Sequence, residues 1–127
     1  MRIYYICTGN SFRSPTAEAL TRRFQPELEV ESAGTHPADH IAENAIEMLG
    51  DVYARQFVKP GPDPVSQRAI DEADRIVVMK QEHLDHLLEH YQVDPDRITN
   101  WDIDDPIHEG VDPREQFDEL LSAVKSL

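Results

Sequence analysis

Four short apolar runs, each set between helical patterns, constrain the fold of this chain more than any other feature. The runs are rich in β-branched and aromatic residues and span residues 2–6, 28–33, 75–79 and 98–101. Strands that alternate with helices pair in parallel, because each helical crossover returns the chain to the same end of the sheet. The pattern predicts an α/β fold, a single doubly wound domain over residues 1–127 with helices on both faces of the sheet.

Helix boundaries follow from apolar periodicity and from residues that start or stop helices. Ser14 suits the N-cap of the first helix, Pro15 suits its first turn, and Pro26 ends it. Gly50 closes the second helix. The predicted helices span residues 14–25, 41–49, 66–73, 81–91 and 113–124.

Polar, reactive residues follow two of the predicted strands. The run Cys7-Thr8-Gly9-Asn10-Ser11-Phe12-Arg13-Ser14-Pro15 comes directly after the first strand, and an acidic segment follows Trp101 at the end of the fourth. In open α/β sheets, ligands bind in the crevice beyond the carboxyl ends of the strands. The two segments are therefore predicted to meet at one site.

The loop after the first strand has the residues that a phosphate group needs. Backbone N–H groups from Thr8 to Arg13, wrapped into a concave nest at the start of a helix, supply donors and a favourable dipole. Gly9 and Asn10 tolerate the left-handed backbone that such a loop requires. Arg13 adds a planar, permanently charged fork that binds two phosphate oxygens. The run predicts a phosphate-binding loop.

The same surroundings suit nucleophilic chemistry at phosphorus. A helix N-terminus and a nearby cation favour the thiolate form of Cys7, and Ser14 can donate its hydroxyl to the sulfur. Breaking a phosphate ester also requires a proton for the departing oxygen. We assign that role to Asp105, which can then act as the base that activates water against a phosphocysteine intermediate.

Charge and cysteine content exclude several classes of partner. The net charge of −13 argues against nucleic acid and anionic membranes, which both require basic surfaces. The single cysteine cannot form an internal disulfide, and no apolar run has the length of a signal peptide or a membrane span. We expect a soluble, cytoplasmic protein, monomeric, acting on a phosphorylated protein or a small aryl phosphate.

Together these residues make the chain resemble members of the low-molecular-weight protein tyrosine phosphatase family. The resemblance runs through nearly the whole length and depends on a set of short motifs. These are the Cys-x5-Arg-Ser-Pro loop at 7–15, Ser-Pro-Thr-Ala-Glu-Ala-Leu at 14–20, Ser-Ala-Gly-Thr at 32–35, Ala-Arg-Gln at 54–56 and Asp105-Pro106.

The resemblance implies a phosphomonoester hydrolase of the protein tyrosine phosphatase type that needs no metal or other cofactor. It assigns Cys7 as nucleophile, Arg13 as phosphate clamp and Asp105 as acid and base, with Asn10 bracing the loop and Ser14 supporting the thiolate. It also implies a four-stranded parallel sheet whose first strand is central. The predicted substrate-binding residues are Thr8, Gly9, Asn10, Ser11, Phe12 and Ser14.

Several positions depart from the family pattern. Phe12 stands where many relatives have a second, protective cysteine. Val52 stands where some relatives have a histidine that braces the loop asparagine, so support for Asn10 must come from elsewhere or be weaker. Ile107 and His108 replace the paired tyrosines of animal members, so regulation through their phosphorylation is not expected.

Ser11 leaves the substrate open, because phosphoarginine-directed relatives have threonine there and arsenate reductases have serine. A protein arginine phosphatase is therefore one alternative. An arsenate reductase is another, although with one cysteine it would need a small external thiol. A non-catalytic phosphate-binding module is a third.

Three histidines on one predicted helix invite comparison with a metal site. His83, His86 and His90 share a face opposite the leucines of that helix. A polar face opposite an apolar one is typical of an amphipathic surface helix. We therefore expect these histidines to be solvated rather than functional.

Overall fold

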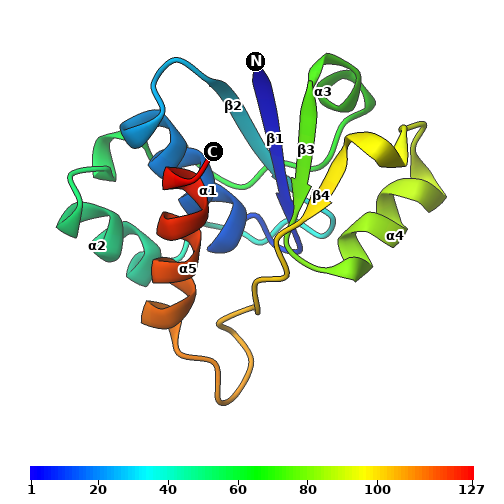
Figure 1. Cartoon of the computed structure of the whole chain (residues 1–127). Coiled ribbons are helices and arrows are strands. Elements are labelled where there is room, and N and C mark those ends of the chain that lie inside the picture. The colour runs from blue at the N-terminus through cyan, green and yellow to red at the C-terminus, as the bar shows by residue number, and fades with distance from the viewer.

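The computed structural model describes residues 1–127 and contains one sheet with its flanking helices. Figure 1 shows the order of the elements along the chain. They are β1 (Arg2–Cys7), α1 (Arg13–Phe24), β2 (Glu29–Gly34), α2 (Glu43–Asp51), η1 (Arg55–Phe57), α3 (Gln67–Glu72), β3 (Arg75–Val78), α4 (Gln81–His90), η2 (Pro95–Arg97), β4 (Ile98–Asn100) and α5 (Pro113–Lys125).

The sheet is four-stranded and entirely parallel, with strand order β2-β1-β3-β4. The strand β1 therefore lies between two neighbours, as the resemblance implied, and is buried on both faces. Because side chains alternate along a strand, Ile3, Tyr5 and Cys7 face one hydrophobic cluster while Tyr4 and Ile6 face another. The predicted α/β fold is confirmed.

Helices cover both faces of the sheet. On one face α1 packs against α5, with α2 beside them, and on the other face lie α3 and α4 (Figure 1). The first and last helices of the chain are thus neighbours in space. No helix combines the length and the apolar character that crossing a membrane requires.

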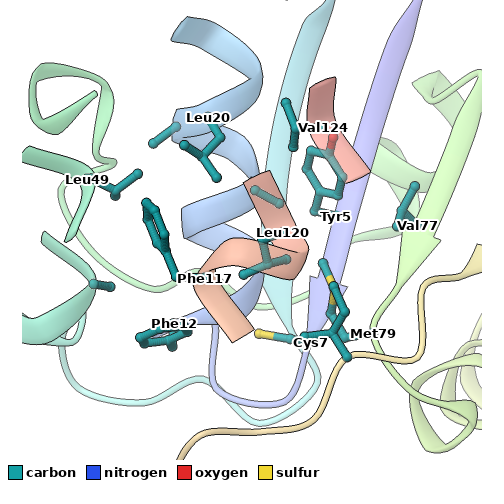
Figure 2. Close-up of a cluster of buried hydrophobic side chains, with 14 of the residues drawn as sticks. Tyr5, Cys7, Phe12, Leu20, Leu49, Val77, Met79, Phe117, Leu120 and Val124 are labelled. Atoms are coloured by element: carbon teal, nitrogen blue, oxygen red, sulfur yellow. The ribbon is translucent and has the colours of Figure 1, made fainter. Parts of the chain in front are cut away.

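The hydrophobic cluster beneath α1 and α5 extends to the loop that follows Cys7. Figure 2 shows Cys7 at the end of β1, close to Phe12 and to Met79, with Phe117 and Leu120 of α5 nearby. The buried side chains around Cys7 hold the end of β1 rigidly, because tightly packed side chains have few alternative positions. The loop that follows Cys7 therefore starts from a fixed point.

The start of α1 differs from the sequence-based prediction. Ser14 was expected to cap the helix, but α1 begins at Arg13, and Phe12 occupies the N-cap position without any side-chain bond. The Ser14 hydroxyl lies instead 3.0 Å from the Cys7 sulfur. The helix N-terminus is thus left without a side-chain cap where the loop meets it.

Candidate active site

The loop after β1 is held from outside by the segment that follows β2. Amides of residues 35–42 bind four of its carbonyl oxygens. The bonds are Thr35 N–H to Cys7 O (3.0 Å), His36 N–H to Thr8 O (2.8 Å), Ala38 N–H to Gly9 O (2.9 Å) and Ala42 N–H to Ser11 O (3.0 Å). In a trans peptide the N–H points opposite to the C=O, so outward carbonyls turn the following amides inward.

Those inward amides are free to bind an anion. The loop amides without a hydrogen-bond partner in the chain are those of Thr8, Gly9, Ser11, Phe12 and Arg13. A set of convergent, unpaired N–H groups at the start of a helix is the backbone geometry of a phosphate site. Of the six amides predicted to form the nest, all but that of Asn10 are unpaired and can bind an anion.

The Cys7 sulfur lies at the base of this nest. It accepts the Asn10 amide at 3.3 Å and lies 3.0 Å from the Ser14 hydroxyl. Both neighbours can donate a hydrogen bond to the sulfur, and a thiolate accepts such bonds more strongly than a neutral thiol does. The arrangement suits a thiolate held at the bottom of a cup of amides.

The Arg13 guanidinium lies between Thr8, at the start of the loop, and the acidic segment. The Arg13 side chain is only 2% exposed, and its guanidinium donates to the carbonyl of Ile103 at 3.0 Å. It also lies 3.4 Å from the Thr8 hydroxyl and 3.3 Å from a carboxylate oxygen of Asp105. The cation of the loop therefore contacts the acidic segment from the far end of the chain.

Asp105 shares a pocket with Cys7 and Arg13. The pocket has a volume of about 460 Å³ and includes Ser11, Phe12, His36, Ala38 and Ile107 in its lining. The other Asp105 oxygen accepts the Ile107 amide at 3.1 Å, which fixes the carboxyl at the pocket wall. The two segments predicted to converge do so.

Asn10 adopts the left-handed conformation expected of it, with φ of 52°. Gly9 does not, so the prediction was wrong for that residue. The glycine whose missing side chain the loop requires is instead Gly34, at the end of β2. A Cβ added at Gly34 would lie 2.5 Å from the Thr8 carbonyl oxygen and 2.9 Å from the Asn10 amide, so β2 can approach the loop only with glycine there.

Ser11 and Phe12 both line the pocket but orient their side chains differently. The Ser11 hydroxyl donates to the carbonyl of His40 at 2.9 Å, in the segment that holds the loop from outside. The Phe12 ring is buried in the core (Figure 2). What both residues offer to a ligand is therefore mainly their backbone amide.

Comparison with known proteins agrees with this geometry. The family model for low molecular weight phosphotyrosine protein phosphatases matches residues 2–127. The chain belongs to this family. The resemblance inferred from the loop and from Asp105-Pro106 is thereby confirmed.

Relatives within the family carry different names. The Escherichia coli K12 phosphatase Wzb is 37% identical over 97 residues, covering 68% of this chain and 60% of Wzb. A putative arsenate reductase of Halobacterium salinarum is 27% identical over 130 residues, covering 97% of this chain and 87% of that protein. The solved YwlE arginine phosphatase of Geobacillus stearothermophilus superimposes with a TM-score of 0.78 at 28% identity, covering 97% of this chain and 87% of that one. The match therefore spans about 60% of the length of Wzb.

One residue of this candidate site was not recognised from the sequence. His83 was expected to be solvated, yet it is 1% exposed and its Nε2 lies 2.8 Å from the Thr8 hydroxyl. The Lys80 amide donates to Nδ1 at 3.1 Å, so Nε2 carries the proton and donates to Thr8. The Thr8 hydroxyl therefore accepts this bond, and its own proton remains available to donate to a bound ligand. The sequence did contain a signal for this role. His83 is the third residue of α4, which begins just after β3, and a side chain at that position can bond the backbone at the helix start.

Burial, and after it the positive charge of Arg13, lowers the pKa of His83 from 6.5 to about 4. His83 is therefore neutral near pH 7 and does not repel Arg13. A group with a lowered pKa in the folded state destabilises the fold as the pH falls below its unfolded value. The affected window runs from about pH 6.5 down to about pH 4.

We expect His83→Gln to reduce the loss of stability in that window. Between pH 7 and pH 4.5 the native chain should lose about 2 kcal/mol more free energy of unfolding than the variant. Urea titrations at both values measure the difference. His90→Gln, at an exposed histidine on the same helix, is the control and should behave like the native chain. An identical pH dependence for His83→Gln would contradict the assignment of a neutral, buried imidazole.

Proposed function

We propose that this protein is a phosphomonoester hydrolase, a protein tyrosine phosphatase that acts through a phosphocysteine intermediate. The observation that carries the proposal is the Cys7 sulfur under a ring of unpaired amides, with Arg13 and Asp105 in the same pocket. A dianionic phosphate fits the amides and the guanidinium, while the sulfur faces the phosphorus.

The chemistry then divides into two displacements. The Cys7 thiolate attacks phosphorus, the bond between phosphorus and the ester oxygen breaks, and Asp105 gives its proton to the departing oxygen. Asp105, now a carboxylate, takes a proton from water as that water attacks the phosphocysteine. The S–P bond breaks, inorganic phosphate forms, and the thiolate returns with Ser14 as its hydrogen-bond donor.

Pocket lining favours a tyrosine-type substrate over the two alternatives. The apolar side chains of Ala38, Ala42 and Ile107 line the pocket, and Ile107 is 82% exposed at its rim. Such a wall suits the flat face of an aromatic leaving group. The Ser11 hydroxyl, on which the phosphoarginine alternative depended, donates its proton to His40 instead. Cys7 is the only cysteine, so an arsenate reductase would depend on an external thiol.

A side-by-side rate comparison tests the proposal. We expect phosphotyrosine peptides to be hydrolysed without added metal, at kcat/KM at least about tenfold above that for phosphoarginine peptides. Arsenate with glutathione should give no reduction above background. Faster release from phosphoarginine would make the protein an arginine phosphatase. Tight phosphate binding with no turnover of any ester would make it a binding module, and either result would contradict the proposal.

The setting of the enzyme follows from its chemistry. A thiolate nucleophile without a second cysteine has no internal protection against oxidation, so a reducing compartment suits it. We place the protein in the cytoplasm, as a monomer acting on phosphorylated protein substrates. The acidic composition supports the absence of nucleic-acid and anionic-membrane partners.

A further inference from the structure

A buried lysine lies behind the phosphate loop, on the side away from the pocket. The Lys59 side chain is 8% exposed, and its ammonium lies 2.7 Å from the Asn10 side-chain oxygen and 2.8 Å from the carbonyl of Ser32. Its third strong partner is the carboxylate of Asp63 at 2.8 Å. An ammonium has three donors, and here each has an acceptor, so the buried charge is fully hydrogen-bonded.

Two donors on one side fix the orientation of the Asn10 amide. Its oxygen accepts Lys59 and also the backbone amide of Asp63, at 2.9 Å. The NH2 group must then point the other way, where it donates to the Ser14 hydroxyl at 2.7 Å and to the Ser32 hydroxyl at 3.0 Å. The amide therefore links the buried ammonium to Ser14.

Ser14 completes a chain that ends on the nucleophile. Because its oxygen accepts the Asn10 amide, its own proton is available to the Cys7 sulfur at 3.0 Å, the shorter of two options. The alternative acceptor, the carbonyl of Ala33, lies at 3.3 Å. Each bond in such a chain polarises the next, so a positive charge at one end strengthens donation at the other.

We propose that Lys59 is a positioning residue that stabilises the Cys7 thiolate through Asn10 and Ser14. It provides the support for Asn10 that the departure at Val52 removes. This inference concerns the same site as the proposed function and rests on it only in that Cys7 is the nucleophile. Two effects are combined: the ammonium holds Asn10 in its left-handed conformation, and its charge polarises the amide towards Ser14.

Other charges near the network do not cancel the ammonium. The Asp63 carboxylate is 67% exposed, so water screens it, whereas the Lys59 side chain is 8% exposed and its partner Asn10 is buried. The Glu18 carboxylate accepts the Ser32 hydroxyl at 2.7 Å but also pairs with Arg22 at 3.4 Å. Neither carboxylate contacts Ser14 or the sulfur.

The test measures thiolate reactivity rather than catalysis. Cys7 is the only cysteine, so its alkylation by iodoacetamide is measured without background from other thiols. We expect Lys59→Met to slow alkylation at pH 6 about tenfold, because less thiolate is present. At pH 9 the difference should disappear, and the rate of the variant should equal or exceed that of the native chain.

Two further variants separate charge from geometry. Lys59→Arg keeps the charge and should stay within about threefold of the native rate at pH 6. Lys59→Gln keeps a donor for Asn10 but no charge, and should be slowed to within about twofold of Lys59→Met. Recovery by Gln equal to that by Arg would show a purely structural role and overturn the polarisation. If Lys59→Met melts below the assay temperature, the Arg and Gln pair decides the result.

Lys125→Met is the matched control. The Lys125 ammonium lies over the Phe24 ring at 4.8 Å, on the surface of the α1–α5 face, and its loss removes the same charge without touching the loop. Its alkylation rate should equal that of the native chain. Equal rates at pH 6 for the native chain and every Lys59 variant would refute the proposal. Because alkylation needs no phosphate ester, this result is independent of whether the protein is a phosphatase.

Discussion

Replacing Cys7 by serine should abolish turnover while phosphate binding persists. A serine hydroxyl is not ionised at neutral pH, so the nucleophile is lost, and kcat should fall by at least about 10⁴-fold. The amides and Arg13 remain in place, so the affinity for inorganic phosphate should change by less than about threefold. Hydrolysis of p-nitrophenyl phosphate measures the first effect, and calorimetric titration with phosphate measures the second.

Together, the turnover and phosphate-binding measurements distinguish the loss of the nucleophile from the loss of the folded loop. Loss of both turnover and phosphate binding would point to a collapsed loop rather than to a missing thiolate. Turnover within about tenfold of the native rate would show that Cys7 does not attack phosphorus, and the phosphocysteine mechanism would fail. Intact-mass analysis after incubation with substrate provides a further test, because a slow phosphoserine would appear as one added phosphoryl group.

Asp105→Asn should slow the enzyme according to how much its substrate needs a proton. With a poor leaving group such as an unsubstituted phenol, kcat should fall about 10³-fold. With a good leaving group such as p-nitrophenol, the fall in the first step should be about tenfold, because the departing oxygen is stable without a proton. The asparagine oxygen can still accept the Ile107 amide, which holds the segment in place, while the contact of the second carboxylate oxygen with Arg13 is lost.

Asp104→Asn is the matched control for this prediction. Asp104 is adjacent in sequence, but its carboxylate pairs with Lys80, which lowers the pKa of Asp104 and keeps it ionised. Asp104 does not line the pocket that contains Cys7 and Arg13, so this variant should retain rates within about twofold for both substrates. Equal losses for good and poor leaving groups in Asp105→Asn would argue against proton donation by Asp105.

The fold and the first contacts of the site could be predicted because they depend on local patterns. Continuous apolar runs between helical periods fixed the parallel sheet, and the rule on strand ends brought Cys7 and Asp105 together. The phosphate nest followed from a short run at a helix start, where few backbone conformations are available. Arg13 could be placed for the same reason, since only five residues separate it from Cys7 in one loop.

The remaining contacts depend on segments far apart in the chain, and sequence spacing does not reveal them. His83 lies 75 residues from Thr8, and Lys59 lies 49 residues from Asn10. His83 looked solvated because its helix partners form a polar face, whereas the register of α4 against the loop turns that one imidazole inwards. Ser14 looked like a cap because serine favours caps, but a nearby sulfur competes for its hydroxyl.

The contact between α1 and α5 has a consequence for how the protein is made. During synthesis α1 emerges from the ribosome well before α5, the helix that covers the core behind Cys7, because α5 lies much later in the sequence. Until α5 follows, the apolar surface of α1 stays uncovered, a situation that favours aggregation and chaperone binding. A nascent chain in which α5 has not yet docked would therefore lack part of the core behind the Cys7 loop, and the loop would become rigid only once α5 packs against α1.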